Sequence, residues 1–196
     1  MTPERIFLNN EHWLKQKLCV DTGFFEQLSN EQNPDILYIG CSDSRVIPEA
    51  FMDVGPGEVF VHRNIGNLVS SFDINTRSVI IHSVENLNVS HIVVCGHYDC
   101  GATKLACNSG TRGPLKEWLR NIEKVYQLNK AELNSISDSG DRCNRLVELN
   151  VHAQCENVRN LPEVCDASRK SSIQVHGWVF DLKTGRIVDL NVDSNR

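Results

Sequence analysis

The sequence predicts an α/β fold with a central, mostly parallel β-sheet flanked by helices, and with a terminal antiparallel hairpin strand. Three observations support this fold. Short apolar segments rich in β-branched residues alternate with longer segments that have helical spacing, as is typical of parallel sheets. Glycine- or proline-containing turns separate many of these segments. A Lys-Thr-Gly-Arg turn at 183–186 joins the last two predicted strands into a hairpin.

The apolar pattern assigns each segment of the chain to a strand or a helix. The predicted strands are 36–40, 58–62, 91–95, 172–180 and 187–192. The predicted helices, in which apolar residues recur every three or four positions, are 4–19, 21–29, 72–88, 102–108, 114–129, 141–158 and 162–170. Prolines interrupt residues 46–57, which are predicted to be loop and short helix. The polar stretch 135–140 is predicted to be a mobile connection.

Length and composition indicate one globular domain over residues 1–196. Hydrophobic residues make up 40% of the chain and the net charge is −5, which argues against a nucleic-acid partner. No run of 18 apolar residues is present, so no membrane association is expected. The first residues lack the apolar segment of a signal peptide, which predicts a cytoplasmic location and free thiols for the eight cysteines.

The first helices carry apolar side chains that have few partners within their own segment. Ile6, Phe7 and Trp13 form part of a rough helical stripe in the first of them. We therefore expect the helices within residues 1–30 to pack on a neighbouring subunit.

Cysteine and histidine follow two of the predicted strands. Cys41 comes directly after the first strand, and His97 and Cys100 lie on the glycine turn that leaves the third. Because the carboxyl ends of parallel strands meet at one edge of a sheet, these three residues are expected to lie close together. Two thiolates and one imidazole suit Zn²⁺ and leave its fourth position for water. The three residues alone are also compatible with buried thiols and a hydrogen-bonded histidine.

Asp43 and Arg45 follow Cys41 at two-residue spacing, and Arg45 offers the Asp43 carboxylate a bidentate partner. In this pair, Asp43 leaves the zinc open and can accept a hydrogen bond from a bound hydroxide. Released from Arg45, Asp43 can become the fourth ligand in a closed form. Zinc lowers the pKa of its bound water to about 7, which makes a hydroxide nucleophile available near neutral pH.

Four motifs together resemble the β-class carbonic anhydrases, in particular the plant-like and fungal-like branch with an open zinc site. They are Cys-Ser-Asp-Ser-Arg at 41–45, His-Arg-Asn-Ile-Gly-Asn at 62–67, Gly-His-Tyr-Asp-Cys-Gly at 96–101 and His-Gly-Trp at 176–178. The order and similar spacing of these motifs carry the resemblance, which runs from about residue 20 to the end.

The resemblance implies one zinc per chain, held by Cys41, His97 and Cys100, with Asp43 and Arg45 as a catalytic dyad. The implied reaction is the reversible hydration of CO₂ to bicarbonate and a proton by zinc-bound hydroxide, with the dyad orienting the hydroxide and gating the site. The implied fold is a central parallel sheet in a homodimer or a higher even-numbered homo-oligomer, in which amino-terminal helices embrace the partner.

The resemblance also assigns residues around the metal. Gln32 matches a glutamine that lines the substrate pocket, and its amide is suited to donate a hydrogen bond to bicarbonate. Gly101 and Ala102 fall at substrate-binding positions, although Ala102 replaces a common glycine. His82 replaces a usual tyrosine, and an imidazole there is a candidate for proton transfer out of the cleft.

One branch of the family has an inhibitory bicarbonate site made of tryptophan, arginine and tyrosine. The matching positions in this chain are Tyr38, Arg63 and Phe180, so the indole and the tyrosine hydroxyl are both missing. This difference argues against an inhibitory site and for an open zinc site near neutral pH. Arg63 is then expected to form a structural ion pair.

Two alternatives to CO₂ hydration stay open. A related enzyme with a narrowed entrance would act on another small linear electrophile such as carbon disulfide. A zinc permanently ligated by Asp43 would be structural, as in a binding or sensor protein. The remaining cysteines are expected to be small core or surface residues: Cys19, Cys95, Cys107, Cys143, Cys155 and Cys165.

Overall fold

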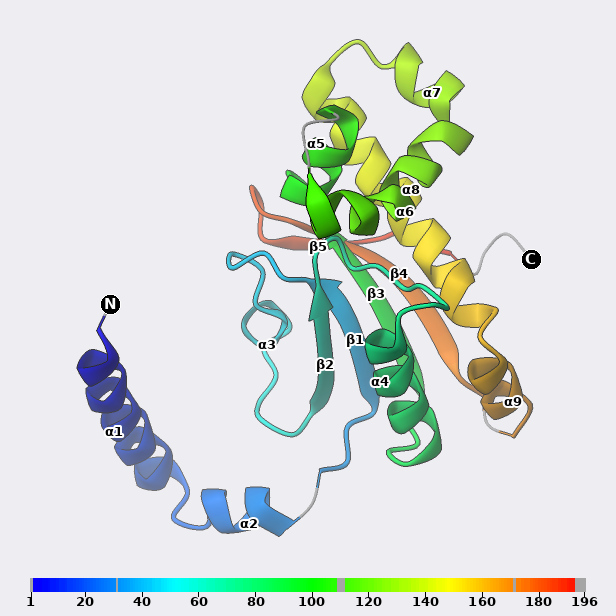
Figure 1. Ribbon diagram of the computed structural model, residues 1–196. Helices are drawn as coiled ribbons and strands as arrows, with labels where there is room; N and C mark the ends of the chain where they lie inside the picture. Colours follow the sequence, from blue (N-terminus) through cyan, green and yellow to red (C-terminus); the bar gives the residue numbers. More distant parts are fainter. Residues whose placement is uncertain (1, 31, 109–111, 171, 193–196) are drawn as a thin grey trace. The chain divides into compact units, whose positions relative to one another are not determined.

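The computed structural model describes residues 2–30, 32–108, 112–170 and 172–192 of the 196-residue chain. From Pro34 onward, the described residues form a five-stranded sheet with helices around it (Figure 1). The strands are β1 (Ile36–Cys41), β2 (Val59–Asn64), β3 (His91–His97), β4 (Gln174–Asp181) and β5 (Arg186–Asp189). Their order is β2-β1-β3-β4-β5. The first four strands are parallel and β5 pairs antiparallel with β4. The predicted fold class is therefore confirmed.

The helices also follow the predicted order. They are α1 (Pro3–Val20), α2 (Phe24–Asn30), α3 (Pro48–Phe51), α4 (Ile74–Glu85), α5 (Gly101–Asn108), α6 (Gly113–Leu128), α7 (Lys130–Ser135), α8 (Ser139–Arg159) and α9 (Pro162–Lys170). Several predicted bounds were wrong. Strands β2 and β3 each end two residues later than predicted, so His97 is the last residue of β3 and does not lie on the turn. Helix α7 was not predicted, and residues 139–140 belong to α8 because Asp138 caps that helix by accepting a hydrogen bond from the Asp141 amide. None of the described helices is long and apolar enough to cross a membrane.

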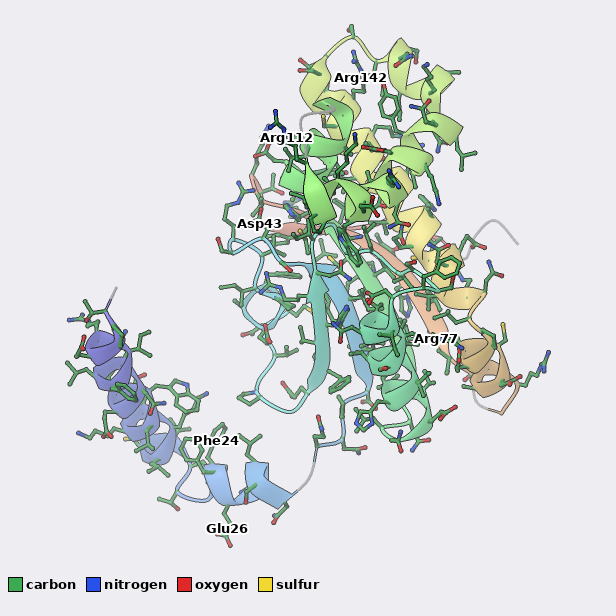
Figure 2. The ribbon with its side chains drawn as sticks, in the orientation of Figure 1. Phe24, Glu26, Asp43, Arg77, Arg112 and Arg142 are labelled. Carbon is green, nitrogen blue, oxygen red and sulfur yellow. The ribbon has the colours of Figure 1, made fainter. Side chains whose placement is uncertain are left out.

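The chain divides into two compact units, Met1–Asn33 and Pro34–Arg196. The first unit contains α1 and α2, and no residue of α1 is buried. Its main apolar contact is an aromatic group in which the Trp13 ring lies 6.5 Å from Phe24 and 5.4 Å from Phe25 (Figure 2 labels Phe24). The single domain over residues 1–196 and the packing of its first helices on a partner subunit stay predictions.

The second unit is built around the sheet, which is covered on both faces. Leu37 and Ile92 point into the larger core, which includes buried side chains of α4, α6 and α8. Tyr38 and Val93, their neighbours in sequence, point to the opposite face, where they pack with Phe51 of α3. Successive strand side chains alternate between faces, so a strand buried on both sides is a continuous apolar run. This explains the apolar pattern of β1 and β3.

Helix α8 lies directly against the backbone of β3 at Gly96. A Cβ atom at this glycine would lie 2.8 Å from Val151 Cγ2 and 2.9 Å from Val147 Cγ1, closer than such atoms approach in proteins. Gly96 directly precedes His97, the last residue of β3. The close approach of α8 therefore fixes the end of the strand that carries the predicted metal ligand.

Buried polar groups of α8 hold the loop that follows β2. Asn150 Nδ2 donates to the Gly66 carbonyl at 3.0 Å, and Gln154 Oε1 accepts from the Val69 amide at 2.9 Å. These bonds satisfy main-chain groups that would otherwise be buried without partners. The loop consequently has a fixed path beside the carboxyl edge of the sheet.

Candidate metal centre and active site

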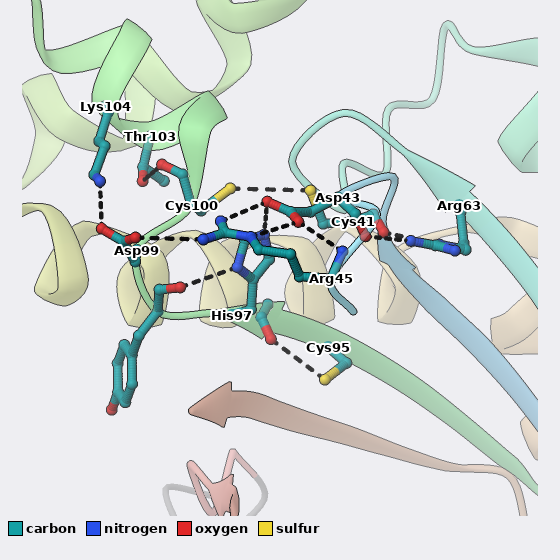
Figure 3. Close-up of polar contacts among 12 residues, drawn as sticks. Cys41, Asp43, Arg45, Arg63, Cys95, His97, Asp99, Cys100, Thr103 and Lys104 are labelled. Atoms are coloured by element: carbon teal, nitrogen blue, oxygen red, sulfur yellow. Dashed lines mark hydrogen bonds and ion pairs between the residues drawn. The ribbon is translucent and has the colours of Figure 1, made fainter. Parts of the chain in front are cut away.

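The carboxyl edge of the sheet brings Cys41, His97 and Cys100 together (Figure 3). Cys41 ends β1, His97 ends β3, and Cys100 lies on the turn before α5. Their candidate ligand atoms lie within 4.8 Å of one another, and the two Sγ atoms are 3.9 Å apart. All three side chains are buried. The sequence expectation that parallel strands would gather these residues is thus met by the geometry.

His97 presents one ring nitrogen to this cluster without a hydrogen-bond partner. Its Nδ1 lies 3.0 Å from the Tyr98 carbonyl oxygen, which assigns the ring proton to Nδ1 because a carbonyl only accepts. Nε2 is buried and has no hydrogen-bond partner among the described residues. A buried nitrogen lone pair without a partner is unfavourable, and a metal ion bound to it would remove that cost. The residues present therefore fit a soft divalent metal such as zinc.

The two thiols of the cluster differ in acidity. The pKa of Cys41 is lowered, chiefly because the Cys100 thiol donates a hydrogen bond to its thiolate. The pKa of Cys100 is raised by the same hydrogen bond and by burial. Cys41 is therefore the first of the pair to ionise when no metal is bound. A bound metal would hold both as thiolates.

Asp43 and Arg45 form a bidentate ion pair beside the cluster. Arg45 donates from Nε to Asp43 Oδ1 at 2.9 Å and from Nη2 to Oδ2 at 2.8 Å, and its amide also donates to Oδ1. These hydrogen bonds hold the pKa of Asp43 well below its usual range, so the carboxylate is ionised. Asp43 Oδ2 lies 3.7 Å from Nε2 of His97. Asp43 is thus fixed at the edge of the metal cluster by Arg45.

Arg63 braces the main chain on which Cys41 and Asp43 are carried. It donates from Nε to the Cys41 carbonyl at 2.9 Å and from Nη2 to the Asp43 carbonyl at 2.6 Å. The parallel register of β1 and β2, which places Arg63 opposite Gly40, explains this contact. The partners described for Arg63 are main-chain carbonyl oxygens. The prediction that Arg63 forms a structural ion pair was therefore wrong.

Comparison with known proteins decides the family. A family model described as carbonic anhydrase matches residues 36–187. A carbonic anhydrase of Emericella nidulans is 48% identical over 193 residues, which cover 98% of this chain and 85% of that protein. A tetrameric β-carbonic anhydrase of Sordaria macrospora superposes with a TM-score of 0.94 at 40% identity, with 96% of each chain covered. The chain belongs to the β-class carbonic anhydrase family.

Other members of the family are similarly close. A carbonic anhydrase of Pseudomonas aeruginosa is 38% identical over 178 residues, which cover 88% of this chain and 80% of that protein. The Coccomyxa β-carbonic anhydrase in complex with acetazolamide matches with a TM-score of 0.91 at 39% identity, covering 95% of this chain and 85% of that chain. The resemblance noted from the four motifs is therefore confirmed, and this chain is a carbonic anhydrase enzyme.

The substrate-binding residues suggested by the family occupy different places. Gly101 and Ala102 begin α5, directly after Cys100. Ala102 is buried, whereas a Cβ at Gly101 would meet no atom within 4 Å, so there is open space next to the cluster. Gln32 is exposed and belongs to the first unit, Met1–Asn33. Its role in the substrate pocket stays a prediction.

His82 lies away from the cluster within the described chain. Its ring packs against Phe60, with the ring centroids 5.6 Å apart. Phe60 is four residues before the end of β2, which corresponds to about 13 Å along a strand. The structure therefore does not bring His82 to the cluster of Cys41, His97 and Cys100 in its own chain, and its role in proton transfer stays a prediction.

The positions that match the inhibitory bicarbonate site include an aromatic group. The Phe180 ring stacks on Phe51 at 4.3 Å, and the Tyr38 ring lies 6.3 Å from Phe51. Tyr38 is fully buried and burial raises the pKa of its hydroxyl, so it stays neutral. Arg63, the remaining matching residue, donates hydrogen bonds to the carbonyls of Cys41 and Asp43.

A second carboxylate, that of Asp99, contacts Arg45 from the turn between β3 and α5. Its Oδ2 lies 3.6 Å from Arg45 Nη1, and its Oδ1 accepts a hydrogen bond from Lys104 (Figure 3). Asp99 adopts a left-handed backbone conformation with φ 62°. Its contact with Arg45 was missed, because it depends on how two separate turns meet.

Proposed function

We propose that this carbonic anhydrase hydrates CO₂ reversibly at one zinc per chain, held by Cys41, His97 and Cys100, with Asp43 and Arg45 as the catalytic dyad. Membership of the family supports CO₂ hydration in general. The observation that carries the residue assignment is the buried, unpartnered Nε2 of His97 beside two thiols. Zinc bound there would supply a hydroxide nucleophile near neutral pH by acidifying a water molecule.

The residues of the chain then position the reactants. Asp43 stays ionised in its bidentate pair with Arg45, and its Oδ2 is available to accept a hydrogen bond from the attacking water. This bond orients the nucleophile, which lowers the entropic part of the barrier. Arg63 donates hydrogen bonds to the carbonyls of both Cys41 and Asp43, which fixes the proposed ligand relative to the dyad carboxylate. In this role Arg63 is a positioning residue.

We also propose that the zinc site is open near neutral pH. The support is the Asp43–Arg45 pair, which holds both carboxylate oxygens and keeps Asp43 from acting as a fourth ligand. A closed form would require Asp43 to leave Arg45. The aromatic packing of Phe180 and Tyr38 further supports the absence of an inhibitory bicarbonate site.

Further parts of this proposal concern the substrate pocket and the assembly. Gln32, Gly101 and Ala102 would contact bicarbonate, and His82 would transfer protons from the cleft of an assembled enzyme. We propose a homodimer or a higher even-numbered oligomer, as supported by the Sordaria protein, described as tetrameric. The exposed apolar residues of α1, Ile6, Phe7 and Leu8, support packing of α1 on a partner subunit. The cytoplasmic location stays a prediction.

The test is stopped-flow CO₂ hydration from about pH 6.5 to 9 on protein whose zinc content has been measured. We expect activity to scale with zinc up to one ion per chain and to be high near neutral pH. Activity that appears only at alkaline pH would contradict the open site. Zinc without activity at any pH would instead favour a structural metal or another substrate.

The assigned proton path has its own test. Replacement of His82 by alanine should lower the maximal rate in dilute buffer, and added imidazole buffer should restore it. An unchanged rate in dilute buffer would exclude His82 from proton transfer without affecting the assignment of the zinc ligands.

A further inference from the structure

A second pair of thiols lies outside the metal cluster. Cys107 is in the last turn of α5 and Cys143 is near the start of α8. Their Sγ atoms are 3.7 Å apart, although 36 residues separate the two cysteines in the chain. Both side chains are half-buried and both thiols are free. The fold therefore holds two oxidisable thiols in contact where no metal ligand has been assigned.

The Cys107 thiol borders a pocket of about 940 Å³ between α5 and α6. Four basic side chains and one carboxylate also line this pocket: Lys116, Arg120, Lys124, Lys130 and Glu123. An excess of positive charge in a concave site attracts small anions. The pocket thus gives an anionic thiol reagent a place to bind next to Cys107.

We propose that Cys107 and Cys143 form a thiol-modification site, which reacts with a small anionic disulfide of the glutathione type to give an intramolecular disulfide. This inference does not depend on the zinc assignment. The main observation in its favour is that the Sγ atoms of Cys107 and Cys143 already lie in contact, 3.7 Å apart.

The reaction balances as thiol–disulfide exchange. One protein thiolate attacks a sulfur of the reagent, forms a mixed disulfide and releases one reagent thiolate. The second protein thiolate then attacks the protein sulfur of the mixed disulfide and releases the other reagent thiolate. The two protein thiols lose two protons and two electrons, and the reagent disulfide is reduced to two thiols that take up both protons.

The geometry places the two thiols for consecutive attacks. Cys107 lines the basic pocket, and Cys143 of α8 lies with its Sγ 3.7 Å from that of Cys107. A thiol attacks only as its thiolate. Whichever of the two attacks the reagent first, the other sulfur is in position to complete the bond.

The disulfide would join the end of α5 to α8. Because α5 begins immediately after Cys100, its far end would then be covalently tied to the helix that packs on β3. Closing a loop of this length stabilises a protein mainly by restricting the unfolded chain. The oxidised enzyme should consequently unfold at a higher temperature than the reduced enzyme.

The experiment uses the zinc-loaded full chain with the exposed Cys19 replaced by serine, so that this thiol cannot compete. Oxidised glutathione is the probe. We expect an intact mass lower by two hydrogen atoms, a peptide linking Cys107 to Cys143, unchanged zinc content and an upward shift of the thermal midpoint. Reduction with dithiothreitol should reverse all of these changes.

Three variants in the same background test the site. Cys107→Ser and Cys143→Ser should each form no cross-link and stop at a mixed disulfide on the cysteine that remains. Cys165→Ser is the matched control: Cys165 is also half-buried, but its thiol donates to the Arg159 carbonyl, so the cross-link should form unchanged.

Two results would overturn the proposal. One is that both thiols remain open to alkylation after prolonged treatment, while the urea-unfolded chain reacts fully with the same reagent. The other is a cross-link that forms only together with zinc loss or with a lower thermal midpoint, since a preformed site should accept the bond without damage to the fold.

Discussion

Two pairs of sulfur atoms lie at almost the same separation in this molecule, yet their surroundings predict different chemistry. The Sγ atoms of Cys41 and Cys100 are 3.9 Å apart, and those of Cys107 and Cys143 are 3.7 Å apart. The first pair has the imidazole of His97 beside it, with Nε2 unpartnered. In the second pair, Cys107 lines a basic pocket instead. The third ligand, and not the distance between sulfurs, therefore distinguishes a metal site from a dithiol.

The strongest way to test this difference is to remove one sulfur from each pair. Cys100→Ala should reduce zinc well below one per chain and lower CO₂ hydration by about a thousandfold or more, because two protein ligands hold zinc poorly. Cys107→Ala should keep a full complement of zinc and near-normal activity. Metal analysis and stopped-flow assays measure both. Equal zinc loss in the two variants would remove the distinction.

The next largest effect should come from the carboxylate beside the first pair. Asp43→Asn should keep one zinc per chain but lose activity by about a hundredfold to a thousandfold, because the charge and the geometry of the dyad are both lost. Zinc content and the maximal rate are measured on the same sample. Full activity in this variant would show that Asp43 does not act in the reaction.

A smaller effect should follow from loss of the hydrogen bonds that Arg63 donates to the main chain. Arg63→Gln removes hydrogen bonds to the Cys41 and Asp43 carbonyls and should cost about 1–3 kcal/mol of unfolding free energy, with faster transfer of zinc to a chelator. Arg142→Gln is a matched control, since Arg142 (labelled in Figure 2) also donates to a carbonyl, that of Ile136. If both variants release zinc at the same rate, the hydrogen bonds of Arg63 to the Cys41 and Asp43 carbonyls do not help to hold the metal.

The smallest expected effect is the pH dependence of the second pair. The pKa of Cys107 is raised from about 9 to about 12, so its contribution to stability is complete below pH 9 and is lost as the pH rises toward 12. Urea unfolding under reducing conditions, between about pH 8 and 11, should show a decline that is weaker by about 1 kcal/mol in Cys107→Ser. Parallel curves for the two proteins would contradict the raised pKa.

Much of the metal cluster around the first pair was predictable from sequence. Cys41 and His97 each end a strand that has a continuous apolar pattern, and the rule that parallel strands align their carboxyl ends places both at one edge. The paired spacing of Asp43 and Arg45 likewise predicts their contact, because residues so close in sequence have few alternatives on a tight turn. The order of strands and helices followed from the same patterns.

The contact between Cys107 and Cys143 and the hydrogen bonds of Arg63 were not predictable in this way. Cys107 and Cys143 meet only because α5 and α8 pack together, and nothing in the spacing of 36 residues indicates it. The contact of Arg63 with Cys41 needs the β1–β2 register, which sequence alone does not supply. The six-residue α7 was missed because a helix this short has too few turns for an apolar repeat to show in the sequence.

The close approach of α8 to β3 sets a limit for anyone who would redesign this enzyme. Position 96 admits no residue larger than glycine unless Val147 and Val151 change with it, since both lie under 3.0 Å from a Cβ there. In a library that randomises residues 96–101, most variants would therefore fail to fold because of the substitution at position 96. Leaving Gly96 constant, and varying the open position at Gly101, keeps the designed variants foldable.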